Sequence, residues 1–325
     1  MTLPRQSTRI FLSERPNGPI SDGTFKLATT VLPRPAVDQV VVRVDYISLD
    51  PAMRLWLDDA RSYLPPIQIG ETIRAPGVGT VVQGNSQLKE ADTVYGFLGW
   101  AEYIIAPAKD LRKISPPEGA AVTDFLGPLG FNGMSACFGL LSVGKIKAGE
   151  TLVVSGAAGA TGSLVCQNCK IKGARVIGLA STLKCSYLVN QLGVDAALDY
   201  TSPTFAKRFL RYCRQTQAVR SDCLVWGDLD VQFWWATLWD QNYPQMIFQK
   251  ARAEGFLATE YIDQYAEAEA EMFGWMNEGK LVYKYHIEEG LERCPEYLGL
   301  LFSGGNEGKL LVKVSGAVTS PETIL

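Results

Sequence analysis

The chain has 325 residues, of which 47% are hydrophobic and 20% charged, and its formal net charge is −3. This length exceeds what one hydrophobic core usually serves, so we expect two domains, and the composition is that of an ordinary globular protein. No block of Lys and Arg could neutralise a phosphate backbone, which argues against nucleic acid as a partner.

The amino-terminal sequence and the cysteines indicate the cell compartment. No apolar run reaches the length of a signal-peptide core or of a membrane span, so we expect a cytoplasmic protein that does not contact the membrane. The seven cysteines lack the spacing of a disulfide framework and fit reduced thiols.

The chain begins, from Arg9 to about Arg112, with short apolar runs that are separated by turn residues, as in "QVVVRVDYISLD" and "GVGTVVQG". This rhythm predicts a β-rich domain. From Gly130 the β-type runs alternate with stretches of helical period, which is typical of βαβ units and a doubly wound parallel sheet. The predicted elements are strand 151–155, helix 158–172, strand 174–179, helix 183–192, strand 196–199, strand 223–226, helix 245–253 and strand 255–259.

The carboxy-terminal part begins with an acidic helix, whose apolar face consists of Tyr265, Ala268, Met272 and Trp275. The tail then returns to short strands around one helix, and we expect it to fold back on the β-rich domain. The parallel sheet is therefore an insertion in that domain. The predicted limits are 1–125 for the β-rich domain, 126–285 for the insertion and 286–325 for the return.

A glycine turn lies where a dinucleotide would bind. "GAAGATG", Gly156 to Gly162, follows a predicted strand and precedes a predicted helix. Glycines are needed at such a place because the backbone must turn tightly and approach the pyrophosphate, which lies on the helix N-terminus. The spacing is G-x-x-G-x-x-G instead of G-x-G-x-x-G, but the surrounding βαβ pattern supports the assignment.

The end of the second predicted strand indicates which dinucleotide is bound. NAD sites place Asp or Glu there to hold the ribose 2′-OH, whereas this chain offers Ser181, Thr182 and Lys184 and no acid. A cation that faces a 2′-phosphate favours NADPH. Taken alone, Lys184 would be interpreted as an exposed helix lysine, and the neighbouring glycine turn is what favours phosphate binding.

Two features of the sequence resemble metal-binding or nucleophile motifs, but their surroundings do not support either function. Cys166 and Cys169 form a C-x-x-C in the body of a predicted helix, with no second pair, so we interpret them as small buried residues. The one histidine, His286, stands beside acidic residues in a tail strand, and there is no G-x-S-x-G nucleophile motif. We expect a structural histidine and no bound metal.

Four ordered segments carry a resemblance to one family. They are "SLDPAMRLWLDDARSYLPPIQIGETIRAPGVGTVV", "GPLGFNGMSACFGLLSVGKIKAGETLVVSGAAGATGS", "IKGARVIGLASTLKCSYLVNQLGVDAALDY" and "LFSGGNEGKLLVKV". They resemble the zinc-independent medium-chain dehydrogenase/reductases, and within them the NADPH-dependent double-bond reductases that include the leukotriene/prostaglandin reductases. The resemblance implies a GroES-like β domain, a Rossmann domain, a cleft between them, a homodimer, and hydride delivery from NADPH to an enone or enal.

The resemblance also implies roles for single residues, each of which could instead serve packing. Those implied to bind the cofactor are Ser135, Gly159, Ala160, Thr161, Gly162, Ser181, Lys184, Tyr200, Phe256, Ala258, Asn306 and Gly308. Among them, Ala160 and Thr161 would face the pyrophosphate, and Lys184 and Tyr200 would hold the 2′-phosphate and adenosine end. Ser135, Phe256, Ala258, Asn306 and Gly308 would line the nicotinamide. Met53 and Tyr63 would lie toward the substrate mouth.

The chain departs from the family pattern between Gly227 and Tyr243. Family members carry there a "-DNVGG-" turn, a helix, a fifth strand and a "GAIS-x-YN" loop, and this segment is too short for all of them. One βα unit is therefore truncated. The "GD-LD" opening favours a helix over residues 228–240, which would lose the strand, and the aromatic content favours a strand, which would lose the helix.

The truncation removes two functional groups of the family, the asparagine of "DNVGG" and the tyrosine of "GAIS-x-YN". That tyrosine hydrogen-bonds the substrate carbonyl or supplies the proton, and a donor at this place stabilises the charge that builds during hydride transfer. Tyr63 and Tyr243 are the hydroxyls that could replace it. Tyr243 also fits the tyrosine with which the family's next helix ordinarily begins.

Three functions follow from this comparison. The first is an NADPH-dependent oxidoreductase that reduces an activated C=C bond, in secondary metabolism or elsewhere, with an altered proton donor. The second is a non-redox cyclase or isomerase that orients a hydrophobic enone or polyene in a cleft lined by Trp234, Trp235 and Trp239. The third is a dinucleotide-binding protein without turnover, because a fold does not fix a function.

Overall fold

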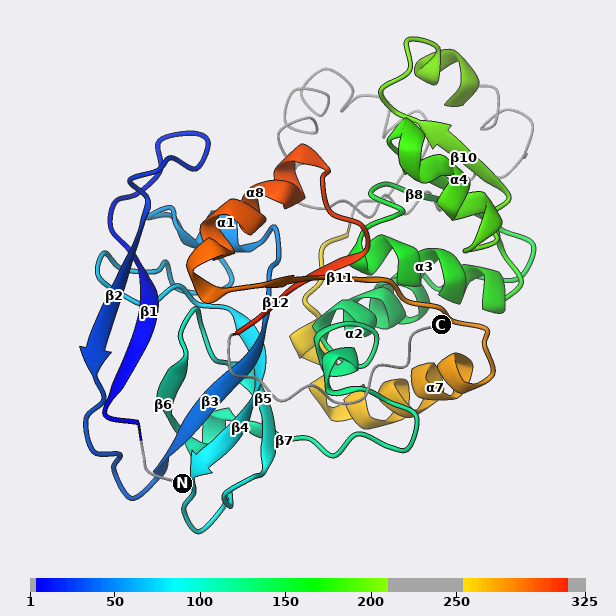
Figure 1. Ribbon diagram of the computed structural model, residues 1–325. Coiled ribbons are helices and arrows are strands. Elements are labelled where there is room, and N and C mark those ends of the chain that lie inside the picture. The colour runs from blue at the N-terminus through cyan, green and yellow to red at the C-terminus, as the bar shows by residue number, and fades with distance from the viewer. Residues whose placement is uncertain (1–3, 210–253, 315–325) are drawn as a thin grey trace. The chain divides into compact units, whose positions relative to one another are not determined.

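The computed structural model describes residues 4–209 and 254–314 (Figure 1). The chain divides into two compact units. The first unit comprises Met1–Leu126, Tyr285–Asn306 and Leu310–Leu325, and the second unit comprises Gly127–Lys284 and Glu307–Lys309. The chain thus runs from the first unit into the second and returns. Whether 1–125, 126–285 and 286–325 fold as the domains expected from the sequence stays a prediction.

The first unit contains a two-stranded antiparallel sheet and a larger mixed sheet (Figure 1). β1 (Gln6–Leu12) pairs with β2 (Phe25–Val31), and a seven-stranded sheet has the order β11-β12-β3-β4-β5-β7 with β6 beside β3. Because β12 pairs with β3, the tail completes the amino-terminal sheet. The strands of the larger sheet are β3 (Gln39–Ser48), β4 (Pro76–Gln83), β5 (Thr93–Phe97), β6 (Tyr103–Pro107), β7 (Arg112–Lys113), β11 (Tyr285–Glu289) and β12 (Lys309–Lys313).

Short helices complete the first unit. The longest of them, α8, has a proline in its first turn and ends at Gly304, whose φ of 73° is a left-handed conformation that suits glycine. The core of the unit includes Leu12, Ile47, Trp100 and Leu310 from both ends of the chain. The helices are α1 (Met53–Trp56), η1 (Ala108–Asp110), η2 (Val122–Leu126), η5 (Leu291–Arg293) and α8 (Cys294–Ser303).

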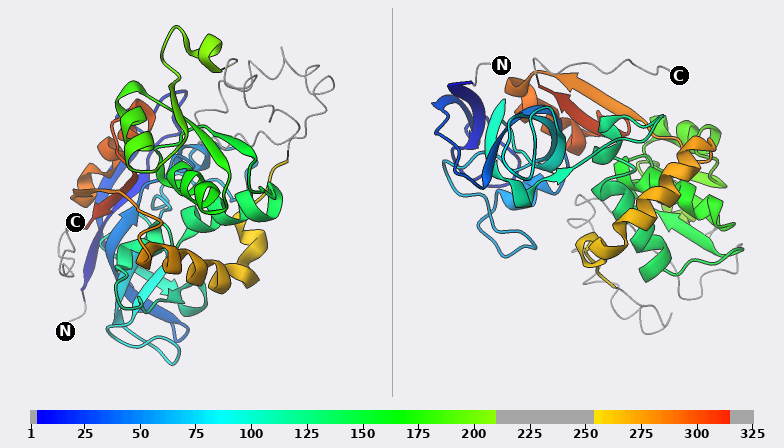
Figure 2. Two further views of the ribbon diagram at one scale, coloured as in Figure 1. Left: turned by 90° about the vertical axis from the view of Figure 1, so that its right-hand side faces the viewer. Right: turned by 90° about the horizontal axis from the view of Figure 1, so that it is seen from below.

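The second unit is built around a parallel sheet, whose described strands have the order β10-β9-β8 (Figure 2). They are β8 (Thr151–Val154), β9 (Arg175–Ala180) and β10 (Ala196–Asp199). Val153, Ile177 and Leu198 are buried on this sheet. The helices that the structure describes over their full length are α2 (Phe131–Phe138), η3 (Gly139–Val143), α3 (Ala160–Ile171), α4 (Thr182–Asn190), η4 (Ala258–Gln264) and α7 (Tyr265–Asn277).

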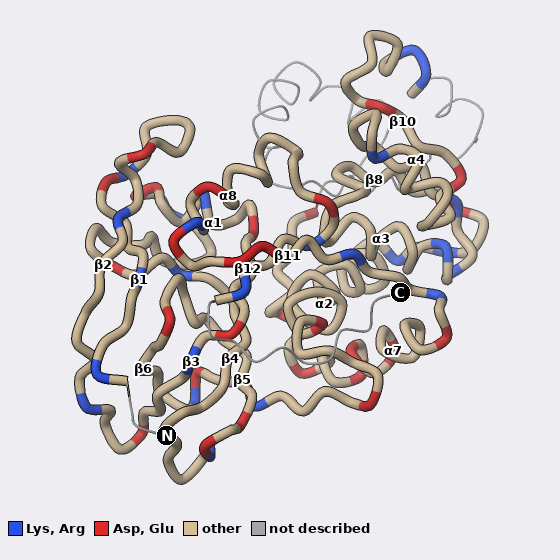
Figure 3. The backbone as a smooth tube through the Cα atoms, in the orientation of Figure 1, with Lys and Arg blue, Asp and Glu red and all other residues tan. Residues whose placement is uncertain are grey.

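The sequence predicted the elements between residues 151 and 199, and the structure confirms each with ends that shift by at most two residues. The apolar face of the acidic helix is confirmed too, because Ala268, Met272 and Trp275 of α7 are buried. Tyr265 at its start is partly buried. The acidic residues of α7 stand out in Figure 3, while elsewhere along the described chain both signs of charge are interspersed.

The predicted strand 255–259 is wrong. The apolar run favours an extended backbone, and Leu257 has one (φ −116°, ψ 130°). The helix η4 nevertheless begins directly after it, at Ala258. The Glu260 N–H donates to the Leu257 carbonyl at 3.0 Å and closes the first turn. The predicted strand 223–226, the predicted helix 245–253 and the alternatives for residues 228–240 lie outside the described residues.

Candidate functional site

The glycine turn connects β8 with α3 in the second unit. Gly156 has a φ of +56°, which is a left-handed conformation, and Gly159 is the N-cap of α3. A Cβ added at Gly162 would lie 2.3 Å from the Gly156 carbonyl oxygen. Since no larger side chain fits there, the first turn of α3 packs directly on the backbone of the loop.

The N-terminus of α3 suits a phosphate group. No side chain caps it, and α3 is 12 residues long, so its first N–H groups carry the partial positive charge of the helix dipole. Ala160, Thr161 and Gly162, which were expected to bind the cofactor, form this first turn. The Asn132 side chain donates a 3.0 Å hydrogen bond to the Thr161 hydroxyl and so fixes the turn to α2.

A second glycine from far along the chain lies beside this turn. Gly308 forms a parallel β-bridge with Gly159, and its φ is 71°. A Cβ at Gly308 would lie 2.1 Å from the Lys284 carbonyl oxygen. The structure thus brings together two residues that the sequence assigned to the cofactor, and it adds Lys284, which sequence reasoning missed because only the fold places it here.

Three of the residues predicted for the adenosine end lie together. Ser181 is the N-cap of α4, and the Lys184 N–H donates to its carbonyl at 2.9 Å. The Tyr200 N–H donates to the Ala180 carbonyl at 3.2 Å, which places exposed Tyr200 beside the end of β9. The backbones of Ser181, Lys184 and Tyr200 thereby lie at one strand end, the place where dinucleotide sites hold the adenosine ribose.

An acid near this strand end escaped the sequence analysis. Asp199 ends β10 and accepts hydrogen bonds from the side chains of Thr182 and Thr201. These hydrogen bonds lower the pKa of Asp199, so it is ionised at neutral pH. The sequence signal for an acid at the ribose lies at the end of the second strand, whereas the parallel sheet brings the end of the third strand to the same edge.

The residues predicted for the nicotinamide end lie on several elements. Ser135 is buried in α2, and Ala258 is buried where η4 begins. Phe256 meets the ring of Tyr261 edge-on at 6.5 Å, and Tyr261 stacks on Phe138 of α2 at 4.7 Å. Asn306, also buried, belongs to the first unit.

The candidate catalytic hydroxyl of the described chain is that of Tyr63, in the first unit. Its side chain is 45% exposed, and its ring meets buried Trp56 edge-on at 6.2 Å. Burial raises the pKa of Tyr63, and the neighbouring Trp56 indole opposes this increase. The phenol therefore stays protonated at neutral pH and can donate a proton or a hydrogen bond.

The remaining substrate-side residues differ from expectation or are not described. Met53, expected toward the substrate mouth, is fully buried in the core of the first unit, because the short helix α1 directs it inward beside Leu57 and Ile67. It therefore contributes packing. Tyr243, Trp234, Trp235 and Trp239 lie outside the described residues.

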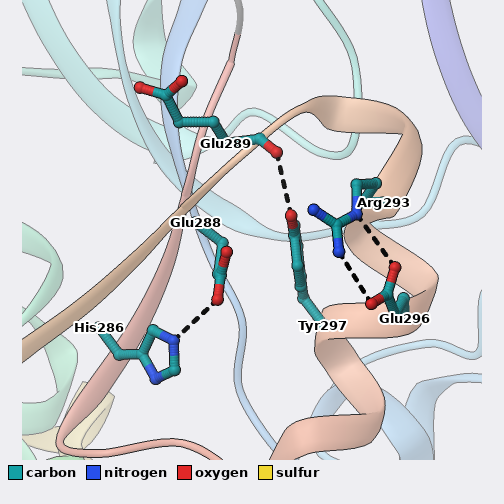
Figure 4. A network of polar contacts seen from close by, with 6 residues as sticks. All are labelled: His286, Glu288, Glu289, Arg293, Glu296 and Tyr297. Atoms are coloured by element: carbon teal, nitrogen blue, oxygen red, sulfur yellow. Dashed lines mark hydrogen bonds and ion pairs between the residues drawn. The ribbon is translucent and has the colours of Figure 1, made fainter.

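The cysteine pair and the histidine lie in surroundings that indicate structural roles. Cys166 and Cys169 are buried in α3, as predicted, and burial raises the pKa of Cys169 to about 12. His286 Nε2 lies 2.9 Å from Glu288 Oε1 within β11 (Figure 4). Nearby, the Tyr297 hydroxyl donates to the Glu289 carbonyl and ties α8 to this strand. In the described ranges no three His, Cys, Asp or Glu side chains gather as metal ligands would.

A helix that spans a bilayer must be long and predominantly apolar. None of the helices within residues 4–209 and 254–314 has the combination of length and apolar character that crossing a membrane demands.

Known proteins are similar to this chain over nearly its whole length. Residues 8–114 match the family described as the N-terminal domain of oxidoreductase. YfmJ of Bacillus subtilis (strain 168) is 34% identical over 339 positions, which cover 97% of this chain and 99% of YfmJ. The NADPH-dependent curcumin reductase of Escherichia coli (strain K12) is 32% identical, with 96% and 98% covered. CurA from Vibrio vulnificus, solved in complex with NADPH, has a TM-score of 0.83 at 28% identity, and the match covers 95% of this chain and 99% of CurA.

The alignments also bear on the length of the chain. They extend over 339 and 341 positions, which is more than the 325 residues present here. Both relatives therefore contain segments that this chain lacks.

Proposed function

Since the chain belongs to the double-bond reductase branch of the zinc-independent medium-chain dehydrogenase/reductases, we propose that it reduces an activated C=C bond with NADPH. The predicted fold class, a GroES-like β-rich part with a Rossmann parallel sheet, is confirmed with the family. The proposed substrates are hydrophobic enones or enals, and the proposed difference from the relatives is the proton donor.

The observation that carries the proposal is the cradle between β8 and α3. Gly162 leaves no room for a Cβ, no side chain caps α3, and Gly308 closes the turn from the other side. These residues fit a pyrophosphate. Ser181, Lys184 and Tyr200 would hold the 2′-phosphate, and Ser135, Phe256, Ala258, Asn306 and Gly308 would line the nicotinamide.

In the proposed reduction, the cofactor and the residues of the chain have different tasks. Bound NADPH supplies a hydride to the β-carbon of the substrate. Negative charge then develops on the carbonyl oxygen, and the α-carbon requires a proton. A hydrogen-bond donor at that oxygen stabilises the charge, and a protonated group or water completes the reduction.

Tyr63 is the proposed donor among the described residues. Its raised pKa keeps the phenol protonated, and its half-exposed position leaves it accessible to a ligand. The altered donor has indirect support, because the aligned relatives contain segments that this chain lacks. Homodimer formation, a cytoplasmic location and a role in secondary metabolism stay predictions.

A cofactor titration tests the proposal. We expect tight NADPH binding, weaker NADH binding, and NADPH oxidation in the presence of at least one α,β-unsaturated ketone or aldehyde from a panel of increasing size. NADPH binding without oxidation in the presence of any member of the panel would contradict the reductase. Absence of NADPH binding would contradict the reductase and the silent dinucleotide-binding protein together.

A further inference from the structure

We propose that Lys284, Glu307 and Tyr187 form a clamp that presses Gly308 onto the phosphate-binding turn and thereby sets the affinity for the dinucleotide. This inference rests on the proposed function, because it takes the turn at Gly159 to be the pyrophosphate site. The three are positioning residues: they act on the turn through Gly308. We call them the Lys284 clamp.

The backbone of Lys284 lies directly against Gly308. The Lys309 N–H donates to the Lys284 carbonyl at 2.8 Å, and a Cβ at Gly308 would lie 2.1 Å from the same oxygen. On its other side Gly308 bridges to Gly159, the N-cap of α3. Gly308 therefore lies between the backbone of Lys284 and the phosphate-binding turn, so a shift of Gly308 changes that turn.

The side chains of the clamp hold this arrangement. The Lys284 ammonium forms an ion pair with the Glu307 carboxylate, the residue directly before Gly308. The same ammonium lies 5.8 Å from the ring centroid of Tyr187 in a cation–π contact. Tyr187 belongs to α4, the helix whose first turn carries Lys184. The clamp thus connects the segment around Gly308 with the helix at the adenosine end.

The clamp restricts the motion of a segment that is rich in glycine. Gly304, Gly305 and Gly308 fall within six residues, and glycine has the largest backbone freedom to lose on ordering. A segment that is already held in place loses less entropy when the cofactor binds, which raises affinity without a new contact to the ligand. The ion pair is half-exposed, so its contribution is moderate and several-fold changes are expected, not loss of binding.

The experiment compares wild type with Glu307→Gln, Lys284→Met and the swap Lys284→Glu/Glu307→Lys. We expect the dissociation constant for NADPH, from equilibrium titration, to rise about fivefold in each single variant. Since the clamp does not touch the reacting atoms, kcat at saturating NADPH should stay within about twofold of wild type. The swap restores the ion pair, although not the cation–π contact, and should recover part of the lost affinity.

A matched control lies at the other end of α3. Lys172 forms an ion pair with Glu271 at 2.9 Å and lies 5.0 Å from the ring centroid of Trp275, which repeats the chemistry of the clamp. Glu271→Gln should therefore leave the NADPH dissociation constant unchanged. Equal weakening in Glu271→Gln and Glu307→Gln, or unchanged affinity in both clamp variants, would overturn the proposal.

A second readout does not depend on the cofactor. In the ligand-free protein, the Lys309 amide is hydrogen-bonded to Lys284, and we expect it to exchange with solvent deuterium several-fold faster in Glu307→Gln than in wild type. Exchange at the wild-type rate contradicts the clamp. If wild type fails to bind NADPH, the proposed function falls, while faster exchange in the variant would still support the holding of Gly308 by Glu307.

Discussion

Gly159 and Gly308 form a parallel β-bridge, although they are far apart in the sequence. Gly159 is the N-cap of the helix at the phosphate-binding turn, and Gly308 precedes the last described strand. The bridge means that the site proposed for the cofactor is built from two separate passages of the chain. A change in either passage should therefore alter cofactor binding.

The close approach at Gly162 predicts a costly substitution. Gly162→Ala places a Cβ 2.3 Å from the Gly156 carbonyl oxygen, so the helix or the turn must move. We expect the free energy of unfolding to fall by about 1–3 kcal/mol and the affinity for NADPH to fall with it. Urea unfolding and equilibrium titration measure the two effects.

A matched glycine serves as the control for this change. Gly274 lies within α7 and has no atom within 4 Å of an added Cβ. Gly274→Ala should leave NADPH binding unchanged and raise the free energy of unfolding by about 0.5–1 kcal/mol, because alanine loses less backbone entropy in a helix. A Gly162→Ala protein as stable as wild type would contradict the packing described for the turn.

Lys184 is expected to determine the preference for NADPH over NADH. Lys184→Glu removes a cation from the proposed 2′-phosphate site and adds a repulsive charge, so the affinity for NADPH should fall about tenfold or more. The affinity for NADH, which lacks that phosphate, should change little. Lys26→Glu, at an exposed lysine of the first unit, makes the same change in net charge and should have no effect. Equal loss of affinity for both cofactors in Lys184→Glu would point to a structural role.

The rate of reduction is expected to depend on the hydroxyl of Tyr63. Tyr63→Phe keeps the ring that packs on Trp56 and removes the proposed donor, so kcat should fall about a hundredfold while NADPH affinity is kept. Tyr103→Phe removes another hydroxyl of the first unit and should leave kcat unchanged. A Tyr63→Phe enzyme with the wild-type kcat would exclude Tyr63 as the donor.

The direction of the Tyr63 pKa also predicts a pH profile. The phenol must be protonated to donate, and burial raises its pKa above the ordinary value of about 10. The rate that depends on Tyr63 should therefore be constant through neutral pH and fall only as the pH rises above that value. A wild-type rate that declines between pH 6 and about 8, with Tyr63→Phe declining in parallel, would assign the titration to another group.

Much of the parallel sheet followed from the sequence, because the signals there are local. The strand that ends before Gly156, the helix that begins after Gly159 and the strand at Ala196 are each marked by apolar period and glycine position. The expected strand at 255–259 failed because the chain turns into a helix directly after the extended residue Leu257. Local propensity does not determine whether an extended residue finds a partner.

The parts of the site that escaped prediction depend on contacts across the fold. Lys284 reaches the turn through its carbonyl, which leaves no mark in the sequence, and Asp199 reaches Thr182 only because β10 and β9 are adjacent and parallel. Met53 was expected near the substrate because a family motif surrounds it, whereas the structure buries it in the core. A motif indicates which residues are near one another in sequence but not which side chain faces solvent.

Transfer of a labelled hydride tests the central claim most directly. NADPH deuterated at C4 of the nicotinamide, in each of its two stereoisomers, is incubated with the protein and an enone that the protein converts, and the product is analysed by mass spectrometry and NMR. The reductase predicts one deuterium at the β-carbon of a saturated product, from one stereoisomer only, and one mole of NADPH oxidised per mole of product. A cyclised or isomerised product without deuterium, and with NADPH unchanged, would contradict the account.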